Sequence, residues 1–481
     1  MSSTDFQNAL QACLDKAIVN GVTPALQCIV INKEKILHNT ISGLASTPSA
    51  SPPDGKPFTN DSALLLASCN KVVLSIVALS VLDKRQVKTG MGIEHLDDHE
   101  KLVEILPEFS PSSGSPLTKI LEGFEEGVLD SDGRKVMKLK YAKTKITLRM
   151  LLTHTAGMVC DWTHPLMAEL YAPTDGSVPH KQPPWQLGRM SDHEVPLIFE
   201  PDTTYATSPD WIALFLTRAT GKSLRTLYQE HVKEPLGIPK DDFDVFRSPE
   251  IERKLADIYV RTPTGDFFKV DLVPYATEDI PPPGYMVYAS GAFWGTSTSF
   301  ALFIQALLRE DTRLLSKAVW DIATVDDIGP RGIRVPSPEM PYANPMISAT
   351  FDNYIDTIPK GELGVNLLQA KVTLSKTVTG RSVGSYGWAG AANTHWVVDP
   401  SKEIAIVFVA HFLPFMEPRV IETRNEIEKL IFDHLERLPE IDWFLFTRDL
   451  AQSVYVEIKK AQKIVSEEGI YEEKSRASLR L

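Results

Sequence analysis

The apolar positions near the start of the chain follow first a helical and then a strand-like pattern. Residues 4–20 carry apolar side chains three or four positions apart, which predicts an amphipathic helix. Two apolar runs follow at residues 25–31 and 36–41, and the polar turn between them predicts an antiparallel hairpin. After a loop rich in Ser and Pro, a second helix is predicted over residues 68–82.

The pattern becomes irregular in the middle of the chain and regular again near its end. Residues 91–290 mix helix-like stretches with loops rich in Pro and Gly. A helix is predicted over 297–308, and strand signals return at 396–398 and 404–409 on either side of a turn. A helix at 417–437 follows them.

These elements predict an α+β fold in which distant parts of the chain meet. Because strand-forming segments lie at both ends and helices between them, one antiparallel sheet built from both ends and flanked by helices is the simplest arrangement. We expect one domain over residues 1–438, with an α/β lobe (1–90 and 291–438) and a largely helical lobe (91–290). Residues 439–481 form a C-terminal extension.

Composition narrows the class of protein. The 481 residues are 43% hydrophobic and 23% charged, which is ordinary for a globular protein and excludes wholesale disorder. The net charge of −12 disfavours nonspecific binding to nucleic acid or to an anionic membrane. No apolar run reaches the ~18 residues of a membrane span, and no secretion signal is recognisable. The four cysteines are scattered, so we expect a cytoplasmic protein without a metal site or disulfide framework.

The first candidate for chemistry is the pair Ser68 and Lys71. Residues three apart share one face of a helix, so a serine at a helix start can meet a lysine one turn later. A hydroxyl needs a base to become a nucleophile, and a lysine acts as a base only when burial keeps it neutral. The flanking residues 64–67 and 72–74 are apolar, as this requires. On this tetrapeptide alone, a capping serine beside a solvated lysine remains the alternative.

Three further segments carry candidate residues. In 146–158, His154 is expected to satisfy loop backbone, with Gly157 capping a helix end. In 205–211, the Tyr205 hydroxyl can relay a proton if it lies beside a lysine. In 385–396, small residues before a strand would let a ligand approach the backbone closely. Taken singly, each could equally be structural.

Together and in this order, the four segments resemble the serine β-lactamase and penicillin-binding-protein family, in its class C and esterase branch. Within that branch, ITLRMLLTHT, Asp210-Trp211 shortly after Tyr205, and Arg218-Ala219-Thr220-Gly221 are similar to the fungal transesterases that acylate lovastatin-type polyketides. The resemblance spans roughly residues 5–435 and implies a β-lactamase/transpeptidase-like fold.

The resemblance also implies roles for individual residues. Ser68 would be the nucleophile, Lys71 its base and Tyr205 the proton relay. The family's Lys-Thr-Gly strand motif is replaced by Trp388-Ala389-Gly390, followed by Ala391. The backbone N–H of a strand residue near Ala391 would join that of Ser68 in holding an oxyanion. Besides Trp388, four tryptophans are candidates to line an apolar pocket: Trp162, Trp185, Trp211 and Trp294.

Two departures from the family pattern matter. The segment before Tyr205 is about two residues shorter than in the family, and Asp202 stands where the family has glycine. Without the strand lysine, the site lacks the cation that would hold the carboxylate of a β-lactam. Neutral esters or thioesters are therefore expected to be better substrates than penicillins.

The expected function is a serine acyltransferase acting on a small secondary metabolite through an acyl-Ser68 intermediate. The expected partners are a thioester or ester donor, for which an acyl-carrier protein is a candidate, and a small acceptor, with no cofactor. A hydrolase of esters, lactones or amides is the first alternative, and a noncatalytic binding descendant is the second. In the latter, the apolar patch at 443–446 would serve as a partner surface, unless it packs back on the helical lobe.

Overall fold

The structure is a computed structural model, and its contacts divide the chain into two units. The larger unit is Ser2–Leu430 and the smaller is Ile431–Leu481 with Met1. The structure describes residues 3–46, 55–181, 188–206, 210–262, 264–271, 281, 283–335 and 361–437. The expected apolar patch at 443–446 and a helix expected near 450–467 therefore lie outside the described residues. Within the described part, no helix combines the length and apolar character needed to cross a membrane.

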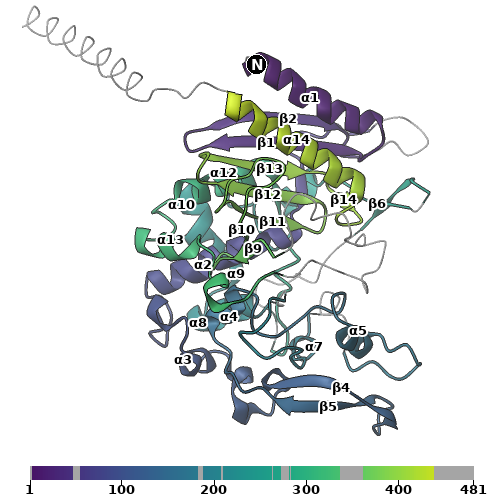
Figure 1. The fold of residues 1–481 in the computed structure, drawn as a ribbon, viewed down its shortest axis with the longest axis vertical. Coiled ribbons are helices and arrows are strands. Elements are labelled where there is room, and N and C mark those ends of the chain that lie inside the picture. Colours follow the sequence, from purple (N-terminus) through teal and green to yellow (C-terminus); the bar gives the residue numbers. More distant parts are fainter. Residues whose placement is uncertain are drawn as a thin grey trace, which may run out of the picture. The chain divides into compact units, whose positions relative to one another are not determined.

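A seven-stranded antiparallel sheet lies in the upper half of the view in Figure 1. Its strand order is β2-β1-β13-β12-β11-β10-β9. The strands are β1 Ala25–Asn32, β2 Ile36–Gly43, β9 Leu363–Val365, β10 Lys371–Thr373, β11 Tyr386–Gly390, β12 Thr394–Asp399 and β13 Ile404–Val409. Strand β1 pairs with β13, placing Cys28 opposite Phe408. The prediction that both ends of the chain build one sheet is confirmed.

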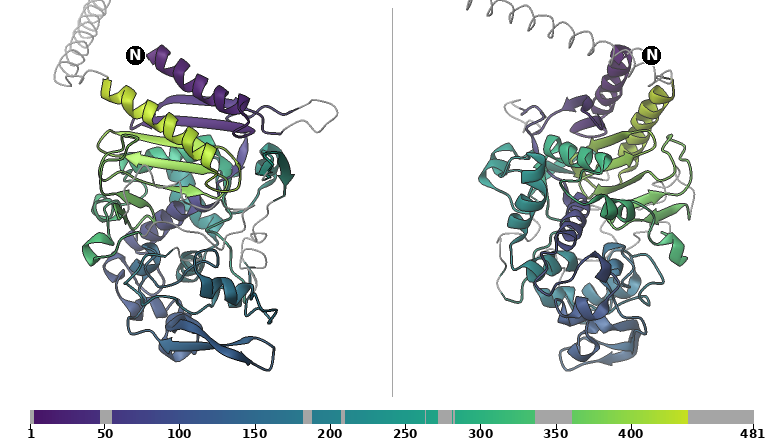
Figure 2. Two further views of the ribbon diagram at one scale, coloured as in Figure 1. Left: turned by 45° about the vertical axis from the view of Figure 1, so that its right-hand side comes forward. Right: turned by 90° about the vertical axis from the view of Figure 1, so that its left-hand side faces the viewer.

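Helices cover both faces of this sheet. Helix α1 (Ser3–Val19) packs on β1 and β2, and α12 (Ser297–Arg309) packs on β1, β12 and β13. Figure 2 shows α12 and the part of α14 (Pro418–Arg437) that belongs to the larger unit, residues 418–430, on opposite faces of the sheet. Helix α2 (Asn70–Asp83) is apolar on nearly every side, as expected of a helix enclosed by protein. The four helices predicted from periodicity are therefore confirmed.

The middle of the chain is less helical than predicted. It contains short helices: α3 His99–Val103, α4 Leu148–Leu152, α5 Pro165–Tyr171, α7 Met190–His193, α8 Trp211–Thr220, α9 Leu224–Tyr228, α10 Glu234–Leu236 and α11 Pro249–Lys254. It also contains the hairpin of β4 (Lys119–Leu129) and β5 (Lys135–Tyr141), visible in Figure 1.

Two further strands, β6 (Ile258–Arg261) and β7 (Phe267–Val270), pair with each other, and β6 pairs with β14 (Phe412–Leu413) from the other end of the chain. The β4–β5 hairpin escaped prediction because it is largely exposed and its strands carry cross-strand ion pairs, such as Lys140 with Glu122, in place of a regular apolar alternation.

Candidate active site

The serine that begins the candidate site stands on a turn between a strand and a helix. Strand β3 (Ala63–Leu65) pairs with β8 (Trp294–Thr296) and leads into a single 3-10 turn, Ala67–Cys69. Ala67 has a φ of +47°, in the left-handed region that residues with a Cβ rarely adopt. The turn is held by neighbouring backbone, because the Leu66 N–H donates to the Phe293 carbonyl at 2.8 Å. Ser68 is thereby placed just before the first turn of α2.

The structure brings Ser68 and Lys71 together. Lys71 Nζ lies 2.9 Å from Ser68 Oγ and 3.3 Å from the Ser290 carbonyl oxygen. The Lys71 side chain is only 5% exposed, and this burial lowers its pKa, while the negative charge of Asp210 opposes the shift. A lysine with a lowered pKa is neutral in a larger fraction of molecules at a given pH, so it can accept the hydroxyl proton.

The segment Ala289–Ser290 is fixed against α2 by side chains from three elements. Asn70 Nδ2 donates to the Ala289 carbonyl at 2.5 Å, and Asn70 Oδ1 accepts from the Tyr228 hydroxyl at 2.6 Å. Asp210 Oδ1 accepts the Ser290 N–H. Sequence reasoning gave no role to Asn70, Tyr228 or Ser290. The signal that could have revealed Asn70 is a polar residue inside an apolar run, one position before the lysine.

Strand β11 lies beside the serine turn. In its ladder with β10, Tyr386 pairs with Val372 and Gly387 pairs with Lys371, and the pairing ends before Trp388. At Gly390 the backbone comes so close to the 3-10 turn that a Cβ would overlap the Leu66 carbonyl oxygen. Ala391 packs against the apolar cluster that contains Ala67. The segment from Trp388 to Ala391 is therefore adjacent to Ser68, where an oxyanion donor would be needed.

Tyr205 is buried next to this strand. Its ring packs in a cluster with Ile328, Ile333 and half-buried Trp388. It also meets the edge of the His154 ring, with centroids 5.8 Å apart, and His154 stacks on Trp388 at 5.9 Å. The structure thus connects Tyr205 to the site through Trp388 and His154, whereas the Lys71 ammonium donates to Ser68 and Ser290.

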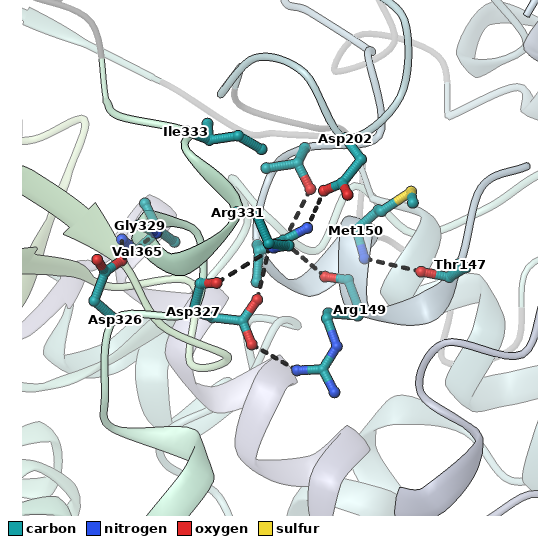
Figure 3. Close-up of polar contacts among 12 residues, drawn as sticks. Thr147, Arg149, Met150, Asp202, Asp326, Asp327, Gly329, Arg331, Ile333 and Val365 are labelled. Carbon is teal, nitrogen blue, oxygen red and sulfur yellow. Dashed lines mark hydrogen bonds and ion pairs between the residues drawn. The ribbon is translucent and has the colours of Figure 1, made fainter. Parts of the chain in front are cut away.

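The shortened segment before Tyr205 is held by backbone bonds and an ion-pair cluster (Figure 3). The Asp202 N–H donates to the Thr155 carbonyl and the Ala206 N–H to that of His154, each at 2.8 Å. Asp202 has a φ of +65°, which explains why glycine suits this position.

Arg331 is the centre of that cluster (Figure 3). Its guanidinium pairs with Asp202 and, at 2.7 Å, with Asp327, and it donates to Thr153 Oγ at 3.2 Å. Asp327 also accepts from Arg149 at 2.5 Å. One arginine therefore ties the Tyr205 loop to the end of α4 and to the segment that packs on Tyr205.

Several expectations at this site need correction. Trp211 is fully buried in the main core, 5.0 Å from the Phe109 ring, and Trp294 is only 2% exposed in the cluster beneath Ala67. Both are core residues, because a pocket wall requires accessible surface. Trp162 is half-buried, and Trp185 lies outside the described residues.

Two further corrections concern α4 and the missing strand lysine. Helix α4 ends at Leu152 with Thr153 as its C-cap, so Gly157 caps no helix and instead packs closely on the Phe199 carbonyl. A cation does stand near Trp388: Lys371 Nζ of the neighbouring strand lies 5.2 Å from its ring centre. This contact could not be foreseen, because it depends on the pairing of two strands.

His154 is buried, as a structural histidine would be. Burial together with the charges of Lys71 and Lys371 lowers the pKa of His154 to about 3, so its ring is neutral. Among the described residues, no group of three or more His, Cys, Asp or Glu side chains is arranged to hold a metal ion.

Several known proteins are similar to this chain in sequence and in fold. Monacolin J acid methylbutanoyltransferase from Aspergillus terreus is 25% identical over 384 residues, covering 78% of this chain and 83% of the relative. Lovastatin esterase from Penicillium rubens is 25% identical over 83% of this chain and 90% of its own. A mutant of simvastatin synthase from Aspergillus terreus has the same fold, with a TM-score of 0.71 and 22% identity over 90% of this chain and 98% of that structure.

These relatives transfer or hydrolyse acyl groups, which agrees with the expected enzyme class. The predicted fold class and family resemblance are confirmed, because the family model described as Beta-lactamase matches residues 10–430. The chain belongs to the Beta-lactamase family.

Proposed function

We propose that this protein is a serine acyltransferase that moves an acyl group from a thioester or ester to a small-molecule acceptor by way of acyl-Ser68. The observation that carries the proposal is the 2.9 Å hydrogen bond between Ser68 Oγ and a lysine removed from water. Burial lowers the pKa of Lys71 and so favours the free amine that the first step needs.

In the first half-reaction, Ser68 Oγ attacks the donor carbonyl and its proton passes to Lys71. The backbone N–H groups of Ser68 and Ala391 hold the oxyanion, and each such donor contributes roughly 3–4 kcal/mol. When the tetrahedral intermediate collapses, the bond to the leaving thiol or alcohol breaks, and the proton reaches the leaving group from Lys71 through Tyr205. Acyl-Ser68 remains.

In the second half-reaction, an acceptor alcohol or amine attacks the acyl carbon. Lys71 and Tyr205 remove its proton and return it to Ser68 Oγ as the ester bond breaks. Transfer is favoured over hydrolysis when water is kept from the acyl-enzyme. The half-buried Trp388 ring beside the serine turn offers an apolar surface for a bulky acceptor.

The named activities of the relatives support this choice of reaction. Monacolin J acid methylbutanoyltransferase is named for transfer of a methylbutanoyl group to monacolin J acid. We propose a short acyl group and a hydrophobic secondary metabolite as the substrates here. An acyl-carrier protein is the candidate donor in the cell.

Hydrolysis is the second candidate function. A lovastatin esterase matches this chain with the same identity as the transferase and with somewhat greater coverage. An esterase would use the same acyl-Ser68, with water in place of the acceptor.

The test is to incubate the protein with 2-methylbutanoyl-N-acetylcysteamine and locate the acyl adduct by peptide mass spectrometry. We expect it on Ser68, absent from Ser68→Ala and retained in the control Ser112→Ala, which alters an exposed turn. Turnover that requires an added alcohol supports transfer, and turnover in buffer alone supports the esterase. If Ser68→Ala and the natural protein behave alike with thioester and ester donors, the proposal is wrong.

A further inference from the structure

Asp210 occupies the N-cap position of α8 but does not cap that helix. Its side chain accepts no hydrogen bond from the first turn of α8. Instead, Oδ1 accepts the N–H of Ser290, eighty residues away in sequence. The carboxylate is 2% exposed, and Oδ2 has no hydrogen-bond partner among the described residues. A carboxylate at an N-cap position is usually stabilised by accepting backbone N–H groups of the first helical turn. Because Asp210 is buried and lacks that bond, its position requires another explanation.

Ser290 connects this carboxylate to the base. Its N–H faces Asp210, and the carbonyl oxygen of the same residue accepts from Lys71 Nζ at 3.3 Å. Because Asn70 also holds the preceding carbonyl, of Ala289, this short segment is fixed in relation to α2. The position of the Ser290 carbonyl is therefore set by Asp210, and the Lys71 ammonium is aimed between that carbonyl and Ser68.

The negative charge of Asp210 also acts on Lys71. Lys71 and Asp210 are both buried and attract each other, so the carboxylate raises the pKa of Lys71 against the larger effect of burial. Burial raises the pKa of Asp210 itself to about 6, so the carboxylate is mostly charged at neutral pH.

The other titratable groups near this pair are mostly uncharged at neutral pH. Cys69 and Cys160 face Lys71, and burial raises the pKa of both thiols. His154 is held neutral. The phenols of Tyr228 and Tyr288 near Asp210 also have raised pKa values. Asp210 is thus the nearby group whose charge bears on Lys71 at working pH.

We infer that Asp210 is a positioning residue of the active site, which orients the Lys71 side chain through the backbone of Ser290. This inference rests on the proposed function, because it takes Lys71 as the base of Ser68. It predicts that the charge of Asp210 and its hydrogen bond have separable effects.

The two effects are separated by Asp210→Asn and Asp210→Ala. The asparagine keeps an oxygen for the Ser290 N–H but removes the charge, so the pKa of Lys71 falls. In the plot of the Ser68 labelling rate against pH, we expect the acidic limb to move to lower pH by about one unit. The alanine also leaves the Ser290 N–H unpaired, so we expect the same shift plus at least a tenfold loss of maximal rate.

The measurement is the pH dependence of labelling by a fluorophosphonate, which modifies an activated serine without needing the natural substrate. A failure of the inference is therefore distinguishable from a failure of the acyl-transfer proposal. The matched control is Asp242→Asn, another buried carboxylate that accepts backbone N–H groups, but at the start of α12.

We expect Asp242→Asn to lower the melting temperature and to leave the pH of the acidic limb unchanged. If Asp210→Asn has the same limb as the natural protein, Asp210 is a structural residue and the inference is overturned. A limb that moves equally in Asp242→Asn also overturns it. Circular dichroism of each variant confirms that the labelled protein is folded.

Discussion

At the scale of single residues, Ser68 is surrounded by backbone that leaves little freedom. Ala67 is in the left-handed region, Leu66 is bonded to Phe293, and Gly390 touches the Leu66 carbonyl. Strained backbone of this kind persists only where the surroundings impose it. The close approach of Gly390 leaves no room for a side chain.

Gly390→Ala is therefore expected to displace β11 from the serine turn. Overpacking of this kind costs about 1–3 kcal/mol of unfolding free energy. We expect that loss in urea denaturation, together with at least a tenfold slower formation of acyl-Ser68. The control Gly265→Ala introduces a Cβ into an open turn at positive φ, so it should lower stability slightly and leave the acylation rate unchanged. Normal acylation in Gly390→Ala would contradict this account of the oxyanion segment.

Two phenols lie near the site, and their roles can be told apart. Tyr205 packs on Trp388. Tyr288 lies two residues before Ser290, whose carbonyl accepts from Lys71. If Tyr205 relays the proton, Tyr205→Phe should lower kcat by about 10²-fold or more, with little change in KM. Tyr288→Phe serves as the comparison in steady-state assays with an ester donor. A large loss of kcat in Tyr288→Phe alone would transfer the relay to that residue.

At the scale of elements, the site is an assembly of segments that meet at their ends. Helix α2 supplies Lys71, β11 supplies Trp388, and the loop before α8 supplies Asp210 and Tyr205. The ion pairs of Arg331 with Asp202 and Asp327 hold the segment that precedes Tyr205.

Arg331→Met is expected to loosen the Tyr205 loop. Removing the guanidinium leaves Asp202 and Asp327 without this partner, which should cost about 2 kcal/mol of unfolding free energy. Tyr205 packs against residues next to Arg331. The fall in kcat at 25 °C should therefore be larger than the increase in the unfolded fraction at that temperature accounts for. Arg313→Met is the matched control, since it removes a more exposed pair, with Asp311. Equal kcat values for the two variants would show that the cluster serves stability alone.

At the scale of the whole molecule, several histidines are buried in neutral form. Burial lowers the pKa of His411 to about 4, and its Nε2 accepts the Leu65 N–H at 2.9 Å, two residues before the serine turn begins. The pKa of His193 is likewise lowered to about 4. A histidine whose pKa is lowered by folding contributes its full share of the unfolding free energy above the unfolded pKa of about 6.5. That contribution is lost as the pH falls toward 4.

The unfolding free energy should therefore be nearly constant above pH 7 and fall steeply between pH 6 and pH 4. His411 would contribute up to about 3 kcal/mol of that change. His411→Asn should be less stable at pH 7 and show a shallower decline, whereas His95→Asn, at the partly exposed end of a 3-10 turn, should follow the natural protein. Urea midpoints at half-unit pH intervals measure the difference. Parallel profiles for His411→Asn and the natural protein would contradict this explanation.

Much of the fold was accessible from the sequence because its main elements are strongly patterned. The apolar runs of β1 and β13 and the helical spacing of α1, α12 and α14 are local properties of consecutive residues. The hairpin β4–β5 was missed, since ion pairs between its strands leave no local apolar signal. Pairing of β6 with β14 was missed because it joins residues about 150 positions apart.

The sequence by itself determined that Ser68 and Lys71 would share a helix face, because a spacing of three residues fixes their direction within one turn. Only the tertiary structure decided which groups surround Lys71: Asp210 and Ser290 come from distant loops, and burial of the amine depends on all of them. It also decided that Trp211 and Trp294 belong to the core and that Lys371 lies over Trp388. Burial and through-space charge are sums over the folded chain, so no local pattern encodes them.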